Sequence, residues 1–120
     1  MASSGGSNGE NGVRGRISFE PGAPGFEDAT VRVRLEDTTV ADAPARIVSE
    51  ATLSGVALPS AGGTIPFLVP AGTAEAGRRY NLRVHVDRAG DGEVAEGDFV
   101  TTQSYPVVLG TDATVVVRSV

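Results

Sequence analysis

The sequence predicts an all-β fold, a seven-stranded antiparallel β-sandwich of immunoglobulin-like or transthyretin-like type. Apolar and polar residues alternate with period two in several segments, which is typical of strands with one buried face. Clusters of Gly, Pro, Asp and Ser separate these segments, as turns require. Aromatic residues make up only 5% of the chain and Trp is absent, so a core of Val, Leu and Ile is expected. Such a core favours strands over helices.

Two segments show the alternation most clearly. TVRVRLED (30–37) places Val31, Val33 and Leu35 on one face and charged residues on the other. YNLRVHVD (80–87) repeats the pattern, with its apolar residues expected inward and His85 outward. The other predicted strands are 13–19, 45–53, 64–70, 99–109 and 113–120. Pro66 and Pro106 lack a backbone donor, so they predict sheet edges or bulges within their strands.

Residues 1–12 (MASSGGSNGENG) are nearly all Ser, Gly and Asn, which predicts a disordered tether ahead of a single β-sandwich domain at 13–120. The tether has no hydrophobic segment and is therefore not a signal peptide as written. Two interpretations remain open. In the first, the protein is cytoplasmic and its N-terminus is frayed. In the second, the protein is exported: its signal peptide has been removed, and Met1 stands where the native precursor has a lipidated Cys.

Composition excludes several classes of function. The basic residues are all Arg, and Asp and Glu outnumber them to leave a net charge of −5, which disfavours nucleic acid and anionic lipid as partners. With no cysteine there is neither a disulfide framework nor a thiolate nucleophile. No apolar run approaches the roughly 20 residues of a membrane span.

The sequence does not predict an enzyme. Its one histidine, His85, falls at an outward strand position with no placed Ser or Cys nucleophile, which is poor support for a catalytic triad. No nucleophile-elbow motif is present, and no glycine-rich phosphate loop precedes a helix. No cofactor is expected on these grounds, apart from the candidate cation that follows.

The segment DRAGDGEVAEGD (87–98) spaces its acids as a calcium loop does. Counted from Asp87, it has Asp at positions one, five and twelve and Gly at position six, as in EF-hand and dockerin-type loops. Asp87, Asp91 and Asp98 would supply carboxylates and Glu93 a backbone carbonyl, so these four are the candidate Ca²⁺ ligands. Position three is Ala89, which removes one ligand and predicts a weak site. The alternative is a hairpin in which AGDG makes the turn and Asp98 bonds a loop amide.

A resemblance to a known family covers roughly residues 13–88. The chain contains, in this order, a GRI strand, the segment VRLEDTTVADAPARIV, an IPF strand and the segment YNLRV. The second of these includes Leu35, Asp37, Asp42 and Pro44. In this the chain resembles the YbaY and YscW-type domain of bacterial envelope lipoproteins. The resemblance implies a lipid-anchored β-sandwich at the envelope, and its secretion-system members are pilotins that help an outer-membrane secretin assemble.

The sequence therefore predicts a non-enzymatic, envelope-associated domain, pilotin-like or chaperone-like, that works by protein contact. The alternative is a calcium-dependent ligand-binding or structural module using the 87–98 loop. A monomer is expected, with a protein partner adding a strand at the edge formed by 64–70 or by 99–109. Asp37 and Asp42 are interpreted as turn-forming residues, since a short acceptor side chain bonds nearby backbone.

Overall fold

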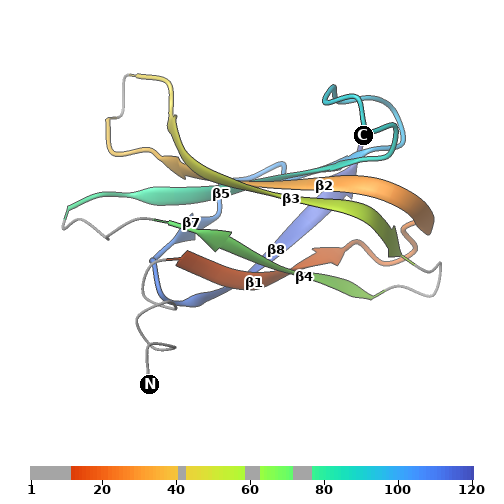
Figure 1. Cartoon of the computed structure of the whole chain (residues 1–120), viewed down its shortest axis with the longest axis horizontal. Coiled ribbons are helices and arrows are strands. Elements are labelled where there is room, and N and C mark those ends of the chain that lie inside the picture. The colour runs from red at the N-terminus through yellow and green to blue at the C-terminus, as the bar shows by residue number, and fades with distance from the viewer. Residues whose placement is uncertain (1–11, 41–42, 59–62, 72–76) are drawn as a thin grey trace.

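The computed structural model describes residues 12–40, 43–58, 63–71 and 77–120, and these contain strands without helices (Figure 1). The strands are β1 (Gly12–Phe19), β2 (Phe26–Asp37), β3 (Arg46–Leu58), β4 (Thr64–Pro70), β5 (Tyr80–Asp87), β6 (Phe99–Val100), β7 (Pro106–Val107) and β8 (Asp112–Ser119). The predicted all-β class is confirmed. The tether expected at residues 1–12 lies outside the described residues, apart from Gly12, which begins β1.

The strands form one sheet in the order β3-β2-β5-β6-β8-β1-β4, with β7 paired to β5. The sheet curls until it is nearly closed, and Figure 1 shows β2, β3 and β5 lying over β1 and β4, with β8 crossing between them. The predicted sandwich of two antiparallel sheets is therefore wrong. One pair, β1 with β8, is parallel, and the others are antiparallel.

Strand β8 joins the two halves of the sheet because it has a different partner at each end. Its residues from Asp112 to Val117 pair with β1, whereas Arg118 and Ser119 pair with β6. A strand that changes partner in this way links the two layers into a barrel-like arrangement. The alternation of apolar and polar residues within one strand does not reveal such a change of partner. Gly15 lies at the close approach of β1 to β8, facing Ala113.

A bulged region in β2 bends the long β2–β3 ribbon. The register shifts on both sides of Ala29, and Asp28 adopts a positive φ of 56°. Gly55 on β3 lies beside Asp28 and also has a positive φ, of 64°. Bulges increase the local twist of a strand, so this one helps the sheet to curl.

The core lies between the two halves of the curled sheet. The alternation predicted its members well in β2 and β5, where the apolar residues are buried and their neighbours face outward. At one end Phe19 and Phe99 meet edge to face, with ring centroids 5.0 Å apart. The buried hydrophobic residues are Val13, Ile17, Phe26, Ala29, Val31, Val33, Leu35, Leu58, Ile65, Phe67, Val69, Leu82, Val84, Val86, Phe99, Val115 and Val117.

The strand predicted at 99–109 is broken into β6 and β7. Between them, two backbone bonds to β5 remain, from the Thr101 N–H to the Val84 carbonyl and from the Leu82 N–H to the Tyr105 carbonyl. Side chains supply other contacts: Asn81 Oδ1 accepts the Tyr105 N–H at 2.7 Å, and the Tyr105 hydroxyl bonds Val116. The prediction failed here because apolar composition does not show which backbone groups will find side-chain partners. Pro106, where a bulge or edge was expected, begins β7, which pairs with β5 alone.

Candidate functional site

The loop that follows β5 is held against the outer face of the sheet by two buried carboxylates. Because strand residues alternate, His85 and Asp87 face the side opposite to the core residues Val84 and Val86. Asp98 lies just before β6, next to the end of β5. The chain between Asp87 and Asp98 therefore begins and ends on neighbouring strands.

Asp87 is fully buried, and each of its carboxylate oxygens accepts hydrogen bonds. Oδ1 accepts the Gly90 N–H at 2.9 Å, while Oδ2 accepts the Gly92 N–H at 2.6 Å and the Arg32 guanidinium at 2.6 Å. Burial raises the pKa of Asp87, but the bonds from Arg32, Gly92 and Gly90, with the charge of nearby His85, outweigh it and lower the pKa to about 2. The carboxylate is thus ionised and organises the turn at 88–92.

Asp98 plays the same part at the other end of the loop. Its Oδ1 accepts the Arg88 N–H at 3.0 Å, and its Oδ2 lies 3.1 Å from the Ala95 N–H and 2.8 Å from His85 Nε2. Burial raises the pKa of Asp98, and the bonds from His85, Arg88 and Ala95 outweigh this so that the pKa is lowered. The expected bond between Asp98 and a loop amide is confirmed.

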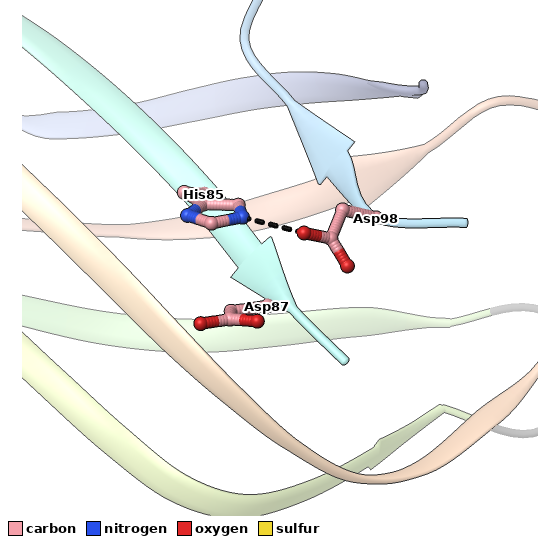
Figure 2. A group of neighbouring side chains, drawn as sticks. All are labelled: His85, Asp87 and Asp98. Carbon is pink, nitrogen blue, oxygen red and sulfur yellow. Dashed lines mark hydrogen bonds and ion pairs between the residues drawn. The ribbon is translucent and has the colours of Figure 1, made fainter. Parts of the chain in front are cut away.

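His85, Asp87 and Asp98 form a cluster whose ligand-type atoms all lie within 4.8 Å of one another (Figure 2). The other two predicted ligands lie apart from this cluster, since Asp91 and Glu93 are exposed and Asp91 Oδ1 accepts the Glu93 N–H at 3.0 Å. Protein donors already hold the oxygens of both buried acids. The calcium site stays a prediction, to be tested by titration. Sequence reasoning placed His85 outward but did not foresee its bond to Asp98, which joins β5 to the start of β6.

The outer face beside the loop contains a shallow cleft of about 250 Å³. Three arginines and His85 lie along it, and the tip of the loop forms one side. The lining residues are Arg32, Arg34, Arg83, Val84, His85, Gly92, Val94, Val100 and Thr101. The alternating pattern of β2 and β5 put these cations on a solvent-facing surface, but only the pairing of the two strands brings them together.

The free edges of the sheet differ in what they offer a partner strand. Strand β4 is an edge, as Pro66 predicted. Of the 99–109 segment, β6 lies between β5 and β8 and is not an edge, whereas β7 pairs with β5 alone. Gly12 lies opposite Pro70 in the β1–β4 register. Its carbonyl oxygen accepts the Gly110 N–H at 2.7 Å and therefore points away from β4. By alternation, Pro66 and Pro70 face the free edge of β4, where neither has an N–H to donate. The longer β3 edge has no proline between residues 46 and 58.

The acids singled out by the family resemblance lie at the far end of β2. Asp37 is largely buried and its Oδ1 accepts the Thr39 N–H at 2.9 Å, the turn bond that was expected. Arg46 and Arg78 each lie 3.4 Å from its Oδ2. The bonds from Thr39, which outweigh burial, and the two arginines lower the pKa of Asp37. Asp42 lies outside the described residues.

One solved structure that this fold resembles is an alternative pilotin from the type II secretion system of Vibrio cholerae. The TM-score is 0.70, and the alignment covers 91% of this chain and 96% of that one at 21% sequence identity. The chain has a pilotin-like fold. No family model matches the sequence, and neither does any curated protein, so membership of the YbaY and YscW family stays a prediction. In the part of the chain that the structure describes, no helix has the length and apolar character of a membrane span.

Proposed function

We propose that this protein is a non-enzymatic, pilotin-like module that acts at the bacterial cell envelope by binding a protein client. The observation that carries the proposal is the shared fold, which extends over nearly all of both chains. The same role is implied by the resemblance to envelope lipoproteins that the sequence of residues 13–88 predicts. The secretin of a secretion system is the client that this role implies.

The chemistry of the loop cluster supports binding rather than catalysis. The pKa values of Asp87 and Asp98 are lowered, so both carboxylates are ionised at neutral pH, and their hydrogen bonds hold the loop in place. A general base would instead need a pKa near the operating pH and access to substrate. The buried acids therefore act as supports for a rigid outer surface.

We expect a client strand to add at β3 rather than at β4. The prolines at the β4 edge remove donors from an added ladder, whereas β3 has no proline. Leu53 of β3 shares a hollow with β4, so the part of the β3 edge on the Arg46 side of Leu53 is where we expect the client strand. Main-chain hydrogen bonds supply much of the affinity in this mode of recognition. Hydrogen exchange with a candidate secretin segment would then show new protection along β3.

The proposed function is tested in the organism that encodes the chain. Deleting the gene should reduce the amount of secretin in the outer-membrane fraction, and the wild-type gene should restore it. A photo-crosslinking residue at Thr52 on β3 should capture the secretin, whereas one at Thr114 on β8 serves as the matched control. An unchanged amount and location of secretin, together with no crosslink to any envelope protein, would refute the proposal.

A further inference from the structure

A second hollow, of about 870 Å³, is formed by β1, β4 and β8 together with Leu53 of β3. Two cations of β1, Arg14 and Arg16, line it and are exposed. Neither has an ion pair or a side-chain hydrogen bond with a residue that the structure describes. Among the described residues that line the hollow, Asp112 is the one acid, and the register places it opposite Arg14. This lining keeps an excess of positive charge, unlike the cleft beside the loop, where each cation lies next to a carboxylate.

Apolar side chains lie next to the two arginines of the hollow. In the β1–β4 register Leu68 lies opposite Arg14. Pro66 lies opposite Arg16 in the same register. Leu68 is 51% exposed, so its apolar surface is open to an occupant. An occupant that matches the hollow therefore offers acidic groups beside an apolar side chain.

The chain itself carries a segment of this composition at residues 91–96 of the loop between β5 and β6, here called the acidic tip. Its acids are Asp91, Glu93 and Glu96, which are exposed and form no ion pair with a residue that the structure describes. The loop has one cation, Arg88, so its exposed acids outnumber its cations. Val94 stands between the two glutamates and is 58% exposed. The acidic tip thus matches the hollow both in charge and in its apolar side chain.

The acidic tip is held in place and lies on the other side of the molecule from its own hollow. Asp87 and Asp98 hold the loop through bonds to its backbone amides, so little conformational freedom is lost when the tip binds. In Figure 1 the loop projects from the layer of β2, β3 and β5, whereas β1 and β4 lie in the other layer. The acidic tip can therefore reach only the hollow of another molecule.

We infer that the acidic tip of one molecule docks in the hollow of a second copy, with Glu93 and Glu96 against the two arginines. Val94 then packs against Leu68. Carboxylate and guanidinium form short, charge-assisted hydrogen bonds, which orient the contact. Because the tip and the hollow are different surfaces, the contact is head-to-tail and leaves one of each free for a further molecule. The inference goes beyond the proposed function, since it assigns a surface other than the part of the β3 edge expected to bind the client.

Analytical ultracentrifugation of the whole chain, from about 10 µM to about 1 mM, tests for this association. Exposed ion pairs contribute little each, so association is expected in the upper part of this range. The weight-average sedimentation coefficient should rise with concentration in low salt and should fall back when salt is added, because salt screens exposed charges. A monomer at every concentration would overturn the inference.

Backbone amide shifts on dilution locate the contact. The signals that change with concentration should belong to residues 14–16, 66–68 and 91–96. The signals of the tip and of the hollow should change together, because each contact uses one of each. Changes confined to β3 would instead show that two β3 edges pair, and they would refute the assignment.

Charge-reversed variants test which groups meet. Arg14→Glu with Arg16→Glu, and separately Glu93→Arg with Glu96→Arg, should each weaken association by roughly tenfold or more, because like charges then face each other. An equimolar mixture of the two variants should restore association, because the reversed hollow then meets the reversed tip. A mixture that stays monomeric would refute the pairing of these groups.

The matched control is Arg79→Glu with Arg118→Glu, which makes the same change of charge at two exposed arginines outside the hollow. This control should associate as the wild type does. Equal losses in the control and in the Arg14 and Arg16 variant would show a general effect of net charge and refute the site. If the tip variant still associates while the hollow variant does not, another segment occupies the hollow and the assignment of the acidic tip fails.

Discussion

Replacing Tyr105 by Phe tests how β8 is held on the side away from β1, at a point that β6 does not reach. The hydroxyl of Tyr105 accepts the N–H of Val116 and donates to its carbonyl, both at 3.1 Å. Strand β6 reaches only Arg118 and Ser119 on that side of β8. One hydroxyl therefore takes the place of a ladder pair.

The size of the effect follows from the two bonds. A hydrogen bond contributes about 1 kcal/mol net, and a group left without a partner costs about 1–3 kcal/mol when it is buried. Val116 is half-buried, so water replaces part of what is lost. We expect Tyr105→Phe to lower the free energy of unfolding by about 1.5 kcal/mol, which corresponds to a fall in Tm of roughly 6 °C for a domain of this size.

Equilibrium unfolding in urea, followed by circular dichroism, measures the change. Tyr80→Phe is the matched control, since it removes the same atom from the other tyrosine, whose hydroxyl bonds no residue that the structure describes. Its effect should stay within about 0.5 kcal/mol. Equal losses in the two variants, or none in Tyr105→Phe, would show that the hydroxyl does not hold β8.

Three other predictions concern β1 and the loop. In Gly15→Ala the new Cβ would overlap the carbonyl oxygen of Ala113, so urea unfolding should show a loss of about 2 kcal/mol or more; an unchanged midpoint would contradict the parallel β1–β8 pairing. The pKa of Asp87 is about 2 against an ordinary 3.8, so its carboxylate stabilises the fold above about pH 4 and this contribution is lost as the pH falls through about 2. Asp87→Asn should flatten that part of the stability profile, and an identical profile would show that this group is not responsible. Millimolar calcium should give saturable amide shifts confined to the loop and abolished by Asp91→Ala, and no response at that concentration would end the calcium hypothesis.

The local sequence was enough to predict the bounds and the buried face of strands that have one face in the core and the other in solvent. The bounds predicted for 64–70 and 80–87 match β4 and β5, and the inward side of β5 is occupied by Leu82, Val84 and Val86 as expected. This succeeds because successive side chains of a strand point to opposite faces, so the alternation is a property of the strand itself. The proline in β4 marked an edge for an equally local reason, the missing donor.

The tertiary structure alone decided which strands became neighbours. Nothing in the pattern of 113–120 shows that β8 pairs with β1 along most of its length and with β6 at its end, and that double pairing turned the expected sandwich into one nearly closed sheet. The sites depend on the same choice. Asp98 reaches His85 because β6 lies beside β5, and Arg34 faces Arg83 because of the β2–β5 register. Alternation assigns a side chain to a face, whereas its neighbours on that face depend on the packing of the whole core.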